Sequence, residues 1–206
     1  MILGKLPLYR VWKARYGTHF KRRRFERIMK LVPLSSDHPV RILEVGCSSG
    51  KDFIQFLDGP NVEIWGVDLD DDAARSIQHS GFHFVHADAE QLPFEDKFFD
   101  LVVSIGLLEH IEPMEKLCRV IAEFDRVGVH QRSVIPSVST IIEPHCGRLF
   151  FPRRLEKTMI GDQPGQILHL NFLSDHSWTK FEGFRNCQVT RLFYIAPLIQ
   201  NTVVYR

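Results

Sequence analysis

The chain has 206 residues, of which 44% are hydrophobic and 25% charged, and its length suits one domain with a substantial core. No apolar run reaches the ~18 residues that a membrane span needs, and Lys5, Pro7 and Arg10 interrupt any signal-peptide pattern. We therefore expect a soluble, cytoplasmic protein.

The four cysteines are scattered without C-x-x-C spacing, so they predict neither a disulfide framework nor a zinc site. The formal net charge is +1, but it is unevenly placed. Residues 1–30 hold ten Lys or Arg against Glu26 alone, whereas the remainder is acidic. The sequence thus combines a basic arm with an acidic body.

The arm begins with an expected short amphipathic helix, in which the apolar residues recur at i, i+3, i+4 and i+8: Leu8, Val11, Trp12 and Tyr16. This stripe is typical of a lid that packs on the body, or of a contact with a membrane surface through residues 1–24. A second helix is expected from Phe20 to Leu31. Its Lys21–Arg24 run is interpreted as a solvated face rather than a nucleic-acid site, because no aromatic stacking platform accompanies the charges.

A strand, a tight turn and a helix are predicted over Arg41–Phe53 and the residues that follow. Such a turn leaves backbone N–H groups free beside glycines, where a ligand can approach closely. The spacing of Gly46 and Gly50 does not match the dinucleotide pattern G-x-G-x-x-G. It is not a P-loop either, because Asp52 replaces the hydroxyl that would hold magnesium.

Strands and helices alternate further along the chain. Val62–Asp68, Phe82–Val85, Leu101–Ile105 and Ser133–Pro136 read as strands, and Pro113 to about Asp125 reads as a helix. The acidic turn at Asp70–Asp72 suits the positive end of a helix dipole, so no metal site is predicted there. Residues 137–173 break the alternation, and a short helix at 174–181 and two strands, Gln188–Tyr194 and Thr202–Tyr205, close the chain.

Four motifs in order resemble those of the class I S-adenosylmethionine-dependent methyltransferases, in particular a type 11-like methyltransferase domain. They are the E-x-G-x-x-x-G loop at Glu44, the acid Asp68, the D-A-x-x-L-P-F run from Asp88, and the F-D-L-V to L-E-H stretch of residues 99–110. The resemblance covers roughly residues 40 to 136.

This resemblance implies an α/β fold. We expect a Rossmann-like, doubly wound, seven-stranded and mostly parallel sheet with an antiparallel last strand and helices on both faces. A single methyltransferase domain is expected over 1–206, with a basic helical lid at 1–38, a cofactor-binding core at 39–136, a substrate cap at 137–173 and a closing helix and strands at 174–206.

The resemblance also implies the cofactor S-adenosylmethionine, with S-adenosylhomocysteine as product. Its expected contacts are Glu44, Gly46, Cys47 and Gly50 at the methionine end, Asp68 and Leu69 at the ribose, Asp88 and Ala89 at adenine, and Ile105 or Gly106 beneath the sulfonium. No catalytic residue is strictly required for methyl transfer, but a histidine base would accelerate attack by a hydroxyl. His110 and His145 are the candidates, and a structural role for His110 is equally compatible with the sequence.

The acceptor is predicted to be a small molecule or a lipid-like metabolite. The fourth strand ends in Ser104–Leu107 and lacks the Asn/Asp-Pro-Pro-aromatic motif that is associated with methylation of base amines and glutamine amides. Nucleic acid is accordingly not expected as a partner. Two alternatives stay open: an RNA- or ribosome-directed methyltransferase that uses the basic arm, and a non-catalytic cofactor-binding module. The oligomeric state is not predicted.

Overall fold

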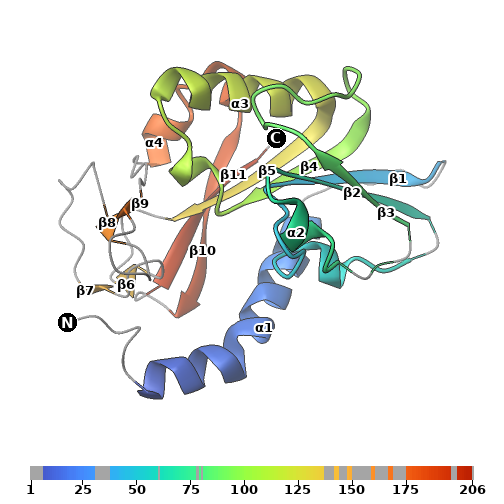
Figure 1. The fold of residues 1–206 in the computed structure, drawn as a ribbon. Helices are drawn as coiled ribbons and strands as arrows, with labels where there is room; N and C mark the ends of the chain where they lie inside the picture. Colours follow the sequence, from blue (N-terminus) through green and yellow to red (C-terminus); the bar gives the residue numbers. More distant parts are fainter. Residues whose placement is uncertain are drawn as a thin grey trace.

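The computed structural model describes residues 7–30, 38–59, 61–77, 79, 81–136, 142–143, 148–149, 159–160, 167–168, 175–195 and 199–205. Figure 1 shows a central twisted sheet with helices on both faces. The helices are α1 (Pro7–Met29), α2 (Asp71–Ala74), α3 (Met114–Val127) and α4 (Asp175–Trp178). In the described ranges, 3₁₀ turns occupy Ile54–Phe56, Leu108–His110 and Glu182–Phe184.

Seven strands form the main sheet in the order β10-β11-β5-β4-β1-β2-β3. Their bounds are β1 (Val40–Val45), β2 (Val62–Asp68), β3 (Phe82–His86), β4 (Phe99–Ile105), β5 (Gly128–Pro136), β10 (Gln188–Ile195) and β11 (Ile199–Tyr205). The neighbours from β5 to β3 pair in parallel, and β11 is antiparallel to both β5 and β10. The predicted doubly wound sheet with an antiparallel last strand is therefore confirmed.

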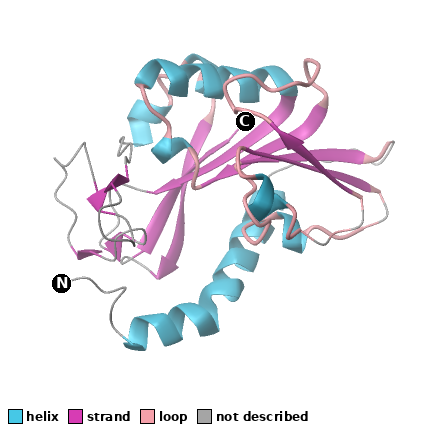
Figure 2. Ribbon diagram, viewed as in Figure 1, coloured by secondary structure: helices cyan, strands magenta, loops and turns pink. Residues whose placement is uncertain are grey.

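Helices lie on both faces of the sheet (Figure 2), and the buried residues form two hydrophobic cores. On one face, Leu117, Val120, Ile121 and Phe124 of α3 pack on the strands together with Trp178. These α3 residues recur at helical spacing, which confirms the core face predicted for this helix. On the other face, Ile28 of α1 covers β1 and β4 beside the segment 53–57.

Three elements differ from the sequence predictions. The arm forms one continuous helix instead of two, because neither Gly17 nor Thr18 is a strong enough breaker to end α1. The helix expected after Gly50 is reduced to the turn Ile54–Phe56, since Gly59 (φ 140°) and Pro60 follow at once. The turn expected at Gly128 is absent, and α3 passes directly into β5 there.

Gly128 has an extended backbone (φ −111°), so a left-handed conformation does not explain the glycine. A Cβ at this position would lie 2.6 Å from Cγ2 of Val102, and close packing against β4 explains it instead.

The arm also differs in its contacts. Lys21 and Arg24, expected on a solvated face, turn toward Asp52, and Arg24 is only 8% exposed. Val11 and Tyr16, expected in a stripe that packs on the body, are 65% and 43% exposed. No helix in the described ranges is both long and apolar enough to pass through a lipid bilayer.

The predicted substrate cap lies mainly outside the described residues. Within it the structure describes two short antiparallel pairs, β6 (Ile142–Glu143) with β7 (Arg148–Leu149) and β8 (Met159–Ile160) with β9 (Ile167–Leu168). The division of the chain into lid, core, cap and closing segment stays a prediction.

Candidate cofactor-binding site

The carboxyl ends of β1, β2 and β4 meet at one edge of the sheet, because these three strands are parallel neighbours. Val45 of β1 is in register with Val67 of β2 on one side and with Ser104 of β4 on the other. The loop that follows β1 therefore lies between the ends of β2 and β4. A ligand site is expected at such an edge, where the strand order reverses.

The glycine loop, residues 46–53, turns sharply at this edge. Gly46 (φ 74°) and Gly50 (φ 67°) have left-handed backbones, which glycine adopts without steric cost. A Cβ on Gly46 would lie 3.2 Å from the Leu107 side chain in the loop after β4. The glycine thus lets the two loops approach each other.

Backbone hydrogen bonds fix the glycine loop to β2. The amides of Gly46 and Cys47 donate to the carbonyl of Val67, at 2.8 and 3.2 Å, and Gly50 donates back to Cys47 at 2.8 Å. The Ser48 amide donates to Oδ2 of Asp68 at 2.7 Å. The acid predicted to hold the ribose therefore also orders the loop.

Asp68 still has acceptor capacity for a ligand. Its Oδ1 accepts the Asp70 amide at 3.0 Å, so each carboxylate oxygen makes one of these backbone contacts. A carboxylate offers about four lone-pair sites, and those remaining suit the two hydroxyls of a ribose. Leu69, the next residue, is 60% exposed and presents an apolar surface at the same edge.

Glu44 and Cys47 are buried beneath the loop. Oε2 of Glu44 accepts the Ile54 amide at 3.3 Å, and the side chain is 1% exposed. Burial, reinforced by the negative charge of Asp52, raises the pKa of Glu44 to about 8. Burial likewise raises the pKa of the Cys47 thiol to about 12, so this cysteine is an inert packing residue against Gly66. The predicted contact of Cys47 with the methionine end of the cofactor would therefore not come from its thiol.

The predicted adenine loop, residues 87–98, is held at the same edge by α3. Asp88 accepts from Lys116 Nζ at 2.6 Å and from the Glu90 amide at 3.0 Å. The hydrogen bond from Lys116 lowers the pKa of Asp88. Ala89 is buried against the main core.

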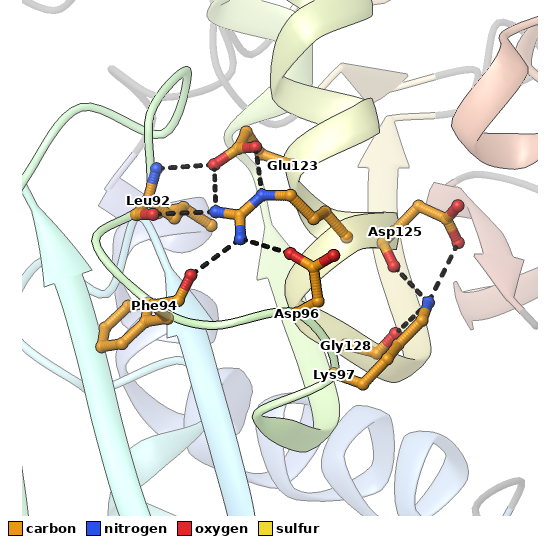
Figure 3. A network of polar contacts seen from close by, with 8 residues as sticks. Leu92, Phe94, Asp96, Lys97, Glu123, Asp125 and Gly128 are labelled. Carbon is orange, nitrogen blue, oxygen red and sulfur yellow. Dashed lines mark hydrogen bonds and ion pairs between the residues drawn. The ribbon is translucent and has the colours of Figure 1, made fainter.

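One guanidinium organises the far half of the adenine loop, as Figure 3 shows. Arg126 of α3 donates to the carbonyls of Leu92 and Phe94, at 2.9 and 2.7 Å, and to Asp96 at 2.9 Å. It also pairs with both oxygens of Glu123, which in turn accepts the Leu92 amide at 2.8 Å. Nearby, Lys97 (φ 55°) donates to the carbonyl oxygens of Asp125 and Gly128.

The remaining predicted residues follow β4. Ile105 ends the strand, and Gly106 (φ 70°) donates its amide to the Val134 carbonyl at 3.0 Å. A Cβ on Gly106 would meet only Glu109 Oε1, at 3.6 Å, so the backbone is open to a close ligand. His110 lies on the turn after the strand and is half-buried. His145 lies outside the described residues.

Sequence reasoning missed the contact that fastens α1 to the glycine loop. Arg24 donates to both the carboxylate and the carbonyl of Asp52, and Lys21 lies 3.3 Å from the same carboxylate. These cations lower the pKa of Asp52 despite its partial burial. Arg24 and Asp52 are 28 residues apart, so no local pattern predicts their contact. Their opposite charges are the one signal for it in the sequence.

The geometry fits S-adenosylmethionine. The glycine loop, Asp68 and the adenine loop lie at one edge of the sheet. They would contact, in this order, the amino-acid tail, the ribose and the adenine of the cofactor. The described ranges contain no group of three or more metal-ligating side chains that is placed to hold an ion.

Comparison with known proteins supports the same class. A family model described as "Methyltransferase domain" matches residues 42–128. A malonyl-[acyl-carrier protein] O-methyltransferase of Geobacter sulfurreducens is 34% identical, covering 52% of this chain and 41% of that protein. A tRNA (carboxymethyluridine(34)-5-O)-methyltransferase of Arabidopsis thaliana is 28% identical, covering 61% of this chain and 30% of that protein. The chain spans less than half the length of these relatives.

A solved structure reaches further along the chain. A SAM-dependent methyltransferase of Methanosarcina mazei superposes with a TM-score of 0.60 at 20% identity, covering 84% of this chain and 92% of that one. The family model thus places a methyltransferase domain over residues 42–128, and the solved structure shows that the wider chain shares its fold.

Proposed function

We propose that the protein transfers the methyl group of S-adenosylmethionine to a small-molecule or lipid-like acceptor. The observation that carries the proposal is the joining of three loops at the carboxyl edge of β1, β2 and β4, with Asp68 tied directly to the glycine loop. The cofactor supplies an activated methyl on a sulfonium, which an acceptor attacks in line.

The protein's part in this reaction is mainly positioning. The left-handed glycine loop and Gly106 let the ligand approach the main chain, and Asp68 orients the ribose. Glu44 supports the loop from below through the Ile54 amide. The proton that a hydroxyl acceptor loses passes to a base or to water.

His110 is the base that we propose from the described residues, because it lies in the turn that follows β4 at the cofactor edge. His110→Asn should then lower kcat by ~10²-fold for a hydroxyl acceptor and remove the acidic limb of the rate profile. A purely structural role for His110 would leave the shape of the pH profile unchanged.

The cofactor assignment is tested by calorimetric titration of S-adenosylmethionine and S-adenosylhomocysteine into the wild type, Asp68→Ala and the control Asp58→Ala. Asp58 is an exposed aspartate to which we assign no cofactor contact. Asp68→Ala should weaken binding by ~1–3 kcal/mol, because a ribose acceptor and a loop contact are lost together. Equal affinity in all three proteins would refute the assignment of Asp68, and no binding to folded wild type would refute the function.

An RNA-directed methyltransferase is the second candidate. It is favoured by the exposed arginines of α1 and by the likeness to a tRNA methyltransferase. Transfer of a radiolabelled methyl group to a small-molecule extract, a lipid extract and total RNA separates the two. If only the RNA becomes labelled, the RNA-directed function replaces the small-molecule proposal. If the cofactor binds but no pool becomes labelled, the protein is a non-catalytic cofactor-binding module.

A further inference from the structure

Helix α1 has two faces with different tasks. Arg24 and Ile28, which lie one turn apart, are buried against the body, and Lys21 lies one turn earlier on the same side. At 100° per residue, Val11, Arg15 and Arg23 point away from this side of the helix. These three side chains are all exposed.

This outward face is a broad exposed arc of the helix that holds Val11, Arg15, Tyr16, Arg23 and Arg27 with the acidic Glu26 among them, and it joins two kinds of chemistry. Its N-terminal part exposes the apolar side chains of Val11 and Tyr16, which are among the large hydrophobic residues that the body leaves uncovered. Its C-terminal part presents Arg23 and Arg27, whereas the guanidinium of Arg22 lies over the ring of Phe56 in the body. The face is apolar at one end and cationic at the other.

The helix is also placed so that this face is accessible. In Figure 1 the N-terminal half of α1 lies below the sheet and apart from β1–β4, while its C-terminal half reaches the core. A helix of 23 residues is about 34 Å long. The described contacts attach α1 to the body through its C-terminal half, where Lys21 and Arg24 meet Asp52 and Ile28 packs in the core.

We propose that the outward face of α1 docks on an anionic lipid surface. An exposed aliphatic side chain such as Val11 gains free energy in the acyl boundary of a bilayer, and each arginine near anionic headgroups adds electrostatic attraction. The sequence just before α1 is rich in aliphatic residues, with Ile2, Leu3 and Leu6. A nucleic acid would match the arginines but would offer nothing to this aliphatic end.

The docking face is separate from the cofactor edge, and the inference does not depend on the proposed function. The inner face of the same helix holds the glycine loop through Asp52. Contact with lipid would therefore leave the Arg24 attachment in place. A lipid-like acceptor would be delivered to the protein at the surface where it resides.

The test is co-sedimentation of the full chain with phosphatidylcholine vesicles that contain about one-third phosphatidylserine, compared with pure phosphatidylcholine. Arg23→Glu/Arg27→Glu reverses two exposed charges on the outward face. Lys180→Glu/Arg185→Glu reverses two exposed charges elsewhere on the body and serves as the matched control. Val11→Asp tests the apolar end.

The wild type should sediment with the anionic vesicles only, and less as salt is raised. The α1 pair should lower the partition coefficient by more than about tenfold, Val11→Asp should lower it as well, and the control pair should leave it near the wild-type value. Equal losses in both pairs would show a non-specific charge effect and overturn the proposal. Binding to a labelled RNA that requires Arg23 and Arg27, without sedimentation on vesicles, would overturn it in favour of nucleic acid.

Discussion

The glycine loop and the adenine loop each rest on one glutamate, yet the two glutamates have opposite protonation behaviour. Glu44 accepts the Ile54 amide at 3.3 Å, and Glu123 accepts the Leu92 amide at 2.8 Å. The pKa of Glu44 is raised to about 8 because the carboxyl is fully buried. The pKa of Glu123 is lowered because its carboxylate pairs directly with Arg126.

The difference shows that a contacting cation, more than a shared hydrogen-bond role, decides whether a supporting carboxyl is charged. A cation does lie near Glu44, but Arg24 makes its contact with Asp52 instead. The negative charge of Asp52 then acts on Glu44 in the same direction as burial. One loop therefore rests on a carboxyl that holds a proton at neutral pH, and the other on an ion pair.

Replacing Glu44 should give the largest effect, and it depends on pH. In the folded wild type Glu44 holds its proton up to about pH 8, whereas the unfolded chain releases it above about 4.5. The free energy of unfolding should therefore fall as pH rises through this window, and the fall should stop above it. Glu44→Gln lacks this titrating group. Its free energy of unfolding, compared with that of the wild type, should therefore increase by roughly 3–5 kcal/mol as pH rises from the lower to the upper end of the window.

Urea denaturation across this pH range measures the effect. Glu123→Gln is the matched comparison, and its sign is reversed, because a lowered pKa gives stability that is present above the unfolded pKa and lost as pH falls. Parallel pH profiles for wild type and Glu44→Gln would mean that Glu44 is charged, and the contrast between the loops would disappear.

Arg126→Met should give the next largest effect. The change leaves Glu123, Asp96 and two loop carbonyls without their donor. Because the guanidinium is partly exposed, we expect a loss of about 2–3 kcal/mol in thermal or urea unfolding. Arg126→Lys should recover only part of it, since an ammonium cannot reproduce the planar fork.

Arg119→Met is the control for this substitution. Arg119 also extends from α3 to the adenine loop, but it is more exposed, and among the described residues its ion pair is with Glu90. Its loss should cost less than about 1 kcal/mol. Similar losses for Arg119 and Arg126 would show that the hydrogen bonds of Arg126 to the carbonyls of Leu92 and Phe94 add no stability.

Arg24→Ala should have the smallest effect on stability of the three, about 1–2 kcal/mol, because Lys21 remains beside Asp52. It should also weaken S-adenosylmethionine binding measured by calorimetry, since Asp52 belongs to the glycine loop. Arg23→Ala, the exposed neighbour on the same helix, should change neither quantity. Unaltered cofactor affinity in Arg24→Ala would show that the contact of α1 with Asp52 does not support cofactor binding by the glycine loop.

Much of the fold followed from local patterns. The apolar runs predicted β1 to β5, the helical spacing of Leu117, Val120, Ile121 and Phe124 predicted α3, and the motif order predicted the sheet. The errors arose where a local signal was weak or was cut short. Gly17 did not end α1, and the apolar residues after Gly50 formed only a turn ahead of Gly59 and Pro60.

The sequence by itself determined the class of the domain and the positions of its loops, because the spacing of Gly46, Gly50, Asp68 and Asp88 is a local property of strand ends. Only the tertiary structure decided what fastens these loops. Arg24 meets Asp52 and Arg126 meets Leu92 across about 30 residues of chain. The burial that sets the pKa of Glu44, and the side of α1 that faces outward, likewise exist only once the helix has packed on the sheet.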